Sequence, residues 1–269
     1  MNSPVMRRVL AGLAAAVLAV IYVPLILVVV NSFNTSKVFA WPPPSFTTQW
    51  WVRAWESSGA REAVWVSVRV ALIATLIALV LGTMASLAVQ RFTFFGKDTV
   101  SLLIILPIAL PGIVTGVALK NAFVSVMGIN LGFWTIVVAH ATFCIVTVFN
   151  NAVARLRRLG VNLEEASMDL GAHRWTTFRL VTFPMMRSSL LAGGLLAFAL
   201  SFDEIIVTTF TAGEGIQTLP IWILQNMFRP QQAPVVNVVA AVLILVSIVP
   251  IRLAQRLGGD EGVPAAHWK

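Results

Sequence analysis

Six long apolar segments, separated by short polar stretches, dominate this sequence and leave few folds open to it. Each has about the 20 apolar residues that a helix needs to cross the hydrocarbon core of a bilayer. The predicted spans are 9–31, 64–90, 100–123, 131–154, 187–210 and 235–256. Only 11% of the residues are charged, roughly half the share of an average soluble domain. We therefore predict an all-α fold in which 1–269 form a single transmembrane domain: a polytopic membrane protein with six transmembrane helices.

The third apolar segment contains helix-breaking residues, Pro107, Pro111 and Gly112. Proline lacks a backbone donor and clashes with the preceding turn of a helix. Within a membrane such a break survives where neighbouring helices or a cavity satisfy the freed backbone groups. The pattern predicts either a simple kink or a helix that lines a substrate path.

The positions of lysine and arginine predict the orientation, because cytoplasmic loops carry an excess of these residues. With the N-terminus in the cytoplasm, thirteen of the nineteen cations lie in cytoplasmic segments. We therefore expect both termini in the cytoplasm. The net charge of +8 follows from this topology, so no nucleic-acid partner is expected. Arg7 and Arg8 precede an apolar run longer than that of a cleaved signal, which predicts an uncleaved first span.

The first outer loop, about 32–63, is rich in tryptophan and proline. Tryptophan is favoured at membrane interfaces because its ring is apolar and its N–H can form a hydrogen bond. The tryptophan content therefore predicts a short interfacial helix near 48–57. A docking surface for a binding protein is equally compatible with it.

No motif for catalysis is present in the sequence. The chain lacks G-x-x-x-x-G-K-[ST], and Gly96-Lys97 has no glycine cradle for phosphate before it. His140, His173 and His267 lack the spacing of metal ligands, and the single cysteine, Cys144, permits no disulfide framework. We therefore predict that the chain is not an enzyme and binds neither a cofactor nor a metal.

The polar segment 162–184 lies between the fourth and fifth spans and is predicted to be cytoplasmic; we call it the coupling segment. Asn162 is a candidate N-cap, and Glu164 and Glu165 then lie in the first helical turn, where the helix dipole favours carboxylates. Gly171 is predicted to end this helix in the left-handed conformation. A second short helix, about 173–180, is predicted to run to Pro184, where the fifth span begins or kinks.

The spacing of this segment resembles the cytoplasmic EAA loop of the inner-membrane permeases of ABC importers. That pattern is Glu-Ala-Ala, three residues, Gly, nine residues, Ile, one residue, then Leu-Pro. Three positions differ here: serine replaces the second alanine, valine replaces isoleucine and phenylalanine replaces leucine. The matching residues are Glu165, Ala166, Ser167, Gly171, Val181, Phe183 and Pro184. The resemblance implies that the coupling segment seats in a groove of an ATP-binding subunit. The candidate coupling residues are Glu165, Ala166, Ser167, Asp169, Gly171 and Pro184. The alternative is an amphipathic connector that only packs on the bundle.

Asp203 and Glu204 form an acidic pair in the fifth predicted span, about 25 Å along the helix and so in the outer half of the bilayer. An ionisable residue at such depth costs on the order of 3 kcal/mol and usually faces a cavity or a partner. Adjacent helical residues point about 100° apart, so only one of the two is expected to face a path. Either a cation such as Lys120 or Arg69 neutralises the pair, or the pair attracts a cationic substrate.

The surrounding run, LLAFALSFDEIIVTTFTAGEGIQTLPIWI, is similar to the spermidine/putrescine permeases of the same family. This narrower resemblance implies a polyamine path with candidate residues Asp203, Glu204, Phe210 and Trp222. Carboxylates pair with polycations, and aromatic faces attract them through cation–π contacts.

Together the resemblances imply a permease subunit of an ATP-driven importer in the bacterial inner membrane. Its expected partners are a second permease subunit, two ATP-binding subunits and an extracytoplasmic solute-binding protein. Three alternatives remain open. The first is an importer of another small solute, such as a thiamine-like cation, ferric ion or an opine. The second is a membrane scaffold or sensor. The third is a proton-coupled secondary transporter, although the sequence lacks the internal repeats of many such proteins.

Overall fold

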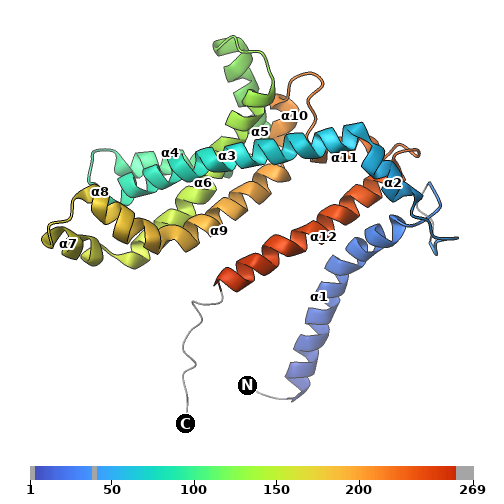
Figure 1. The fold of residues 1–269 in the computed structure, drawn as a ribbon, viewed down its shortest axis with the longest axis horizontal. Coiled ribbons are helices and arrows are strands. Elements are labelled where there is room, and N and C mark those ends of the chain that lie inside the picture. Colours follow the sequence, from blue (N-terminus) through green and yellow to red (C-terminus); the bar gives the residue numbers. More distant parts are fainter. Residues whose placement is uncertain (1–3, 38–40, 259–269) are drawn as a thin grey trace. The chain divides into compact units, whose positions relative to one another are not determined.

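The computed structural model describes residues 4–37 and 41–258, with side chains described up to Val246, and these residues are mainly helical (Figure 1). An isolated antiparallel bridge joins Asn34 and Phe46. The chain forms two compact units, Met1–Arg61 with Trp222–Arg252, and Glu62–Ile221 with Leu253–Lys269. The helices are α1 (Pro4–Asn31), α2 (Gln49–Glu56), α3 (Ser58–Arg91), α4 (Lys97–Ala109), α5 (Gly112–Asn121), η1 (Ala122–Val126), α6 (Phe133–Leu159), α7 (Asn162–Asp169), α8 (Arg174–Thr177), η2 (Phe178–Thr182), α9 (Phe183–Phe202), α10 (Ile206–Thr211), α11 (Leu219–Asn226) and α12 (Ala233–Gly258).

Four helical segments are long and apolar enough to cross a membrane: Val5–Asn31, Ser58–Arg91, Phe133–Leu159 and Arg174–Phe202. The bent pair Lys97–Ala109 and Gly112–Val126 gives a fifth span if it crosses once. The prediction of an all-α membrane protein is therefore confirmed. In α12 the described apolar part is Ala233–Val246, so the count of six stays a prediction. The C-terminal Lys269, predicted to be cytoplasmic, lies outside the described residues.

The third span breaks between α4 and α5, with a bend of 106°. Leu110 is extended, as the residue before a proline prefers to be, and Pro111 lacks the N–H that would continue the helix. The break lies where the sequence predicted it, but the bend is far larger than a kink. α5 and the π-helical turn η1 therefore follow a different direction from α4.

Small side chains bring α3, α6 and α9 together in the core of the unit Glu62–Ile221. The buried cluster joins Ala74 and Ala78 of α3 to Cys144 and Ala152 of α6 and to Ala197 of α9. Such residues let membrane helices approach closely and gain dispersion contacts, which replace the hydrophobic effect as the driving force within lipid.

The coupling segment continues into the fifth span without a break, because Arg174–Phe202 form one long helix. The separate short helix predicted at 173–180 is thus the first part of that helix. Its turn η2 is π-helical, and the N–H of Phe183 bonds to the carbonyl of Phe178, five residues back. Pro184 follows at the start of α9, where its missing N–H is tolerated within the widened turn.

Gly213 gives a test of the packing, because its backbone lies against the backbone at the start of α6. A Cβ at this position would collide with the carbonyl oxygen of Leu131 and lie 2.9 Å from the Cα of Gly132. Backbone atoms cannot move aside as a side chain can, so we expect Gly213→Ala to lower the free energy of unfolding by about 2 kcal/mol. Thermal unfolding in detergent should show this. Gly132→Ala is the control, because a Cβ there meets nothing within 4 Å; equal melting temperatures of both variants would refute the packing.

The outer loop is held by Trp50, which is 1% exposed and whose Nε1 donates to the carbonyl of Asn34 at 2.8 Å. The interfacial helix predicted near 48–57 corresponds to α2 (Gln49–Glu56). Val52 and Trp55 on α2 remain exposed. A lipid interface and a docking surface both stay compatible with this exposure.

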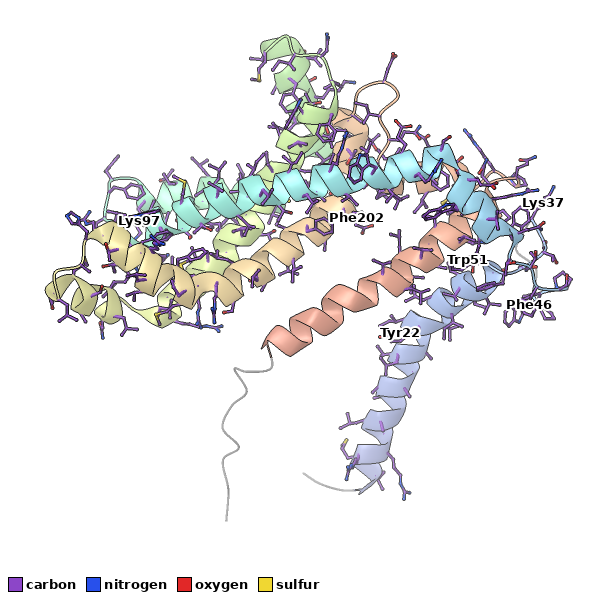
Figure 2. All side chains as sticks on the ribbon, viewed as in Figure 1. Tyr22, Lys37, Phe46, Trp51, Lys97 and Phe202 are labelled. Atoms are coloured by element: carbon purple, nitrogen blue, oxygen red, sulfur yellow. The ribbon has the colours of Figure 1, made fainter. Side chains whose placement is uncertain are left out.

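Helix α1 is apolar beyond Arg8, and none of its most apolar window is buried within the chain. Tyr22, labelled on this helix in Figure 2, is 55% exposed. Such a helix requires lipid or another protein around it, because water would not solvate its apolar surface.

Candidate functional site: the coupling segment and the acidic turn

Helix α7 begins one residue earlier than the sequence predicted. The N-cap is Val161, whose carbonyl accepts the N–H groups of Glu164 at 2.9 Å and Glu165 at 3.0 Å. The predicted cap, Asn162, is therefore the first helical residue; the tight turn after Gly160 already places the carbonyl of Val161 where the helix starts. Glu164 and Glu165 lie in the first turn, as predicted.

Gly171 ends α7 with a φ of +88°, which confirms the predicted left-handed conformation. Its N–H bonds to the carbonyl of Met168 at 2.9 Å, and the N–H of Ala172 bonds to that of Ser167 at 3.1 Å. These two bonds form a Schellman motif, which satisfies carbonyls at a helix end. The turn fixes the angle between α7 and α8.

Most of the predicted coupling residues point away from the chain. Glu165, Ala166, Asp169, Gly171 and Pro184 are exposed, and no residue of α7 is buried. The apolar side chains of the segment are exposed as well: Leu163 52%, Leu170 90% and Trp175 70%. A connector that only packs on the bundle would bury such side chains, so the exposure favours a surface that another protein covers.

Ser167 differs from the other predicted coupling residues, because it faces inward. Its Oγ lies 3.1 Å from Oγ1 of Thr177, and the side chain is half-buried. The hydroxyl pair joins α7 to α8. This contact gives a structural reason for serine where the EAA pattern has alanine.

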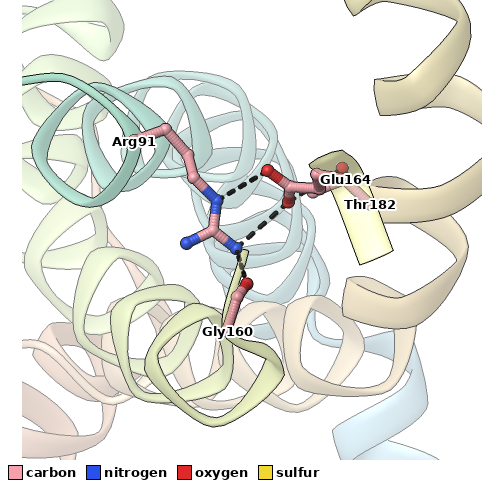
Figure 3. Close-up of polar contacts among 4 residues, drawn as sticks. All are labelled: Arg91, Gly160, Glu164 and Thr182. Carbon is pink, nitrogen blue, oxygen red and sulfur yellow. Dashed lines mark hydrogen bonds and ion pairs between the residues drawn. The ribbon is translucent and has the colours of Figure 1, made fainter. Parts of the chain in front are cut away.

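Arg91 holds the coupling segment to the rest of the unit (Figure 3). Its Nε donates to Oε2 of Glu164 at 2.8 Å, and one of its terminal nitrogens donates to Oε1 at 3.0 Å. The same nitrogen donates to the carbonyl of Gly160 at 2.8 Å. Thr182 donates its hydroxyl to Oε1 of Glu164 at 3.0 Å. We call these four residues the arginine clamp.

The arginine clamp gathers four parts of the chain: the end of α3, the end of α6, the first turn of α7 and the turn η2. The two charged side chains are only 14% and 17% exposed, so water screens their attraction weakly. From the sequence, Glu164 was predicted only as a charge at the helix dipole, and Arg91 was counted only among the cytoplasmic cations. Of the two adjacent acids, Glu164 faces inward and Glu165 outward.

The predicted fifth span is interrupted at the acidic pair. Helix α9 ends at Phe202, labelled in Figure 2, and α10 begins at Ile206. Residues 203–205 form a non-helical link that we call the acidic turn. The 100° separation expected for a continuous helix therefore does not apply to Asp203 and Glu204.

The two acids of this turn differ in their contacts. Oε1 of Glu204 accepts the backbone N–H of Val207 at 2.8 Å and so caps the start of α10. Asp203 is exposed and has neither a hydrogen bond nor an ion pair from its side chain to the described residues. The structure thus leaves Asp203 as the free carboxylate.

Neutralisation of the pair by Lys120 or Arg69 is not observed. Arg91–Glu164 is the ion pair found among the described residues. The guanidinium of Arg69 instead lies over the rings of Phe133, at 5.0 Å, and Trp65, at 5.8 Å. The alternative in which the pair attracts a cationic substrate stays a prediction.

Comparison with known proteins shows the family of this chain. The family described as "Binding-protein-dependent transport system inner membrane component" matches residues 78–258. The chain belongs to this family. The matched region contains the coupling segment and the acidic turn. The protein is thus an inner-membrane component of a transport system, and the family is one of permeases.

Two relatives from Escherichia coli carry the comparison further. The chain is 32% identical over 255 residues to the spermidine/putrescine transport system permease protein PotC, covering 95% of this chain and 96% of the relative. It is 33% identical over 231 residues to the putrescine transport system permease protein PotI, covering 83% and 81%. A solved bacterial ABC transporter involved in alginate import has a TM-score of 0.68 at 14% identity, covering 98% of this chain and 99% of that one. The last likeness concerns the fold alone.

The two aromatic residues predicted to line the path of this permease have packing partners. Phe210 of α10 packs on α5, where a Cβ on Gly116 would lie 2.8 Å from its Cδ2. Trp222 belongs to the other unit, where it is 5% exposed and lies beside Gly59. Their role in a path stays a prediction.

A groove of about 750 Å³ lies between α3 and α9. Leucine and phenylalanine side chains line most of it, with Arg187 toward the coupling segment. The acidic turn is not part of its lining. The lining carries the cation Arg187 and no carboxylate, and this charge does not suit a polycation.

Proposed function

We propose that this chain is a permease subunit of an ATP-driven importer and forms part of the translocation path for a polyamine, spermidine or putrescine. The observation that carries the proposal is the full-length similarity to the spermidine/putrescine permease of Escherichia coli. A free carboxylate at a break in a membrane helix supports it, because a charge at such depth is retained for a function.

The energy for transport comes from separate subunits in this proposal. The complex contains a second permease subunit, two ATP-binding subunits and an extracytoplasmic solute-binding protein, and both termini of this chain lie in the cytoplasm. Helix α7 docks in a groove of one ATP-binding subunit through its exposed face, with Leu163 and Leu170 as apolar anchors and Glu165 as a rim charge. The lack of a phosphate-binding loop in the sequence fits this division of labour.

Movement then passes from the docked helix to the spans. Closure of the ATP-binding subunits shifts α7, and the arginine clamp carries that shift to α3 and to the helix that contains α9. Access to the path alternates between the two sides of the membrane. Asp203 attracts the cation, while Glu204 keeps its role as the cap of α10.

Replacing Asp203 by Asn tests the proposed path, because it removes the charge and keeps the shape. We expect uptake of labelled spermidine and putrescine to fall about tenfold or more, the loss expected for one charge-assisted hydrogen bond. The assay uses cells that lack their native polyamine importers and co-express the neighbouring transport genes. Glu204→Gln is the matched control: its amide oxygen still accepts the N–H of Val207, so its uptake should stay close to wild type.

Equal uptake by Asp203→Asn and wild type, at equal expression, would remove Asp203 from the path. A wild-type complex that contains its ATP-binding subunit but takes up no polyamine would discard the substrate and leave an importer of another solute, such as a thiamine-like cation, ferric ion or an opine.

A further inference from the structure

His140 makes a buried polar contact that the proposed mechanism has not used. It lies on α6 and is 0% exposed. Its Nδ1 is 2.7 Å from Oγ of Ser201 on α9, and its Nε2 is 2.8 Å from Oγ1 of Thr208 on α10. The imidazole therefore joins the two helices that flank the acidic turn.

The hydrogen bonds around His140 are satisfied together by one tautomer. Thr208 donates its single hydroxyl proton to the carbonyl of Glu204 at 2.9 Å. Its oxygen is then free to accept from an N–H at Nε2, and Ser201 donates its hydroxyl proton to Nδ1. The ring is neutral in this arrangement, and both of its nitrogens have a partner, as a buried polar group requires.

The chain of contacts leads directly into the acidic turn. Ser201 lies two residues before Asp203, and Thr208 bonds to the carbonyl of Glu204. Non-helical backbone at membrane depth persists only where protein or a water-filled cavity satisfies its polar groups. The bridge from His140 fixes both ends of the turn to α6 and supplies part of that satisfaction through Thr208.

We infer that His140 is a positioning residue for cation recognition: by bridging α9 and α10 across their break, it holds Asp203 where the substrate meets it. This inference rests on the proposed function of the acidic turn. His140 itself does not touch the substrate, because it is fully buried. Its effect on transport passes through Asp203.

Transport kinetics test this dependence. His140→Phe fills the same space without hydrogen-bonding groups, and His140→Gln keeps one donor and one acceptor. We expect His140→Phe to raise the KM for spermidine about fivefold or more, because each of the two lost hydrogen bonds has a net effect of about this size. We expect His140→Gln to recover most of the loss. In an Asp203→Asn background, His140→Phe should raise the KM no further. An equal rise in both backgrounds would overturn the inference, because it would show an effect independent of Asp203.

A second measurement needs no substrate and separates this inference from the proposed function. Asp203→Cys, in a Cys144→Ala background, gives a thiol whose reaction rate with a membrane-impermeant cationic methanethiosulfonate reports the position of the turn. We expect His140→Phe to change this rate several-fold and Thr147→Val to leave it unchanged. Thr147 also lies on α6, but its hydroxyl bonds only to the carbonyl of Phe143 in the same helix. An unchanged rate in His140→Phe would overturn the inference even if polyamine uptake is confirmed.

Discussion

Replacing Arg91 by Glu is expected to abolish most uptake, and exchanging the two charges, Arg91→Glu with Glu164→Arg, is expected to restore much of it. Arg91 binds Glu164 through two nitrogens at 2.8 and 3.0 Å, and both side chains are mostly shielded from water. In Arg91→Glu the new carboxylate repels that of Glu164, and α7 then loses its attachment to α3. The cost to the local structure is on the order of 2 kcal/mol, between that of exposed and buried pairs.

The measurement for this prediction is the amount of substrate taken up for each ATP hydrolysed by the purified complex. Arg158→Glu is the control, because Arg158 is an exposed cation at the end of α6 with no ion pair among the described contacts. Failure of the exchanged pair to recover any uptake would show that the clamp does not act through its ion pair. An effect of Arg158→Glu as large as that of Arg91→Glu would point to general surface charge instead.

Replacing Gly171 by Val is the second change for which we expect a near-complete loss of uptake. The residue has a φ of +88°, and a β-branched side chain is a strong outlier in that region. Nothing lies within 4 Å of a Cβ at this site, so the penalty comes from the backbone and not from a clash. The altered turn would change the angle between α7 and α8 and prevent docking. Co-purification of the ATP-binding subunit should fall together with uptake.

Replacing Gly171 by Asn separates two possible causes of such a loss: strain in the backbone and the bulk of the added side chain. It adopts the left-handed conformation more readily than other non-glycine residues. Gly171→Asn should therefore keep most of the co-purification that Gly171→Val loses. If both variants fail equally, the surface at Gly171 must remain free of any side chain, and close approach of the partner would replace the conformational explanation.

The sequence was most informative where the determinants are local. Apolar length marks the spans, and Pro111 marks the break in the third one, because these features act through their own backbone. Pro107, which was named with it, lies inside α4. The end of α7 was also predictable, since a glycine after a helical run adopts the left-handed conformation. The EAA spacing then identified the segment that the family match includes.

Contacts between distant residues account for what was not predicted. Arg91 and Glu164 lie 73 residues apart, and His140 and Ser201 lie 61 apart. No periodicity in the sequence links such pairs. The end of α9 at Phe202 was hidden for another reason: the apolar run continues past the acidic pair, and only the capping bond from Glu204 to Val207 reveals the break. Asn162 was a plausible cap by residue type, but the turn at Gly160 moved the helix start to Val161.

The measurement that tests the central claim most directly is spermidine uptake into proteoliposomes that contain the purified complex of this permease and its partner subunits. With the binding protein outside and ATP inside, we predict accumulation of labelled spermidine, with no accumulation when a non-hydrolysable ATP analogue replaces ATP. Accumulation driven by a proton gradient without ATP, or none under any of these conditions from an ATPase-active complex, would contradict the account.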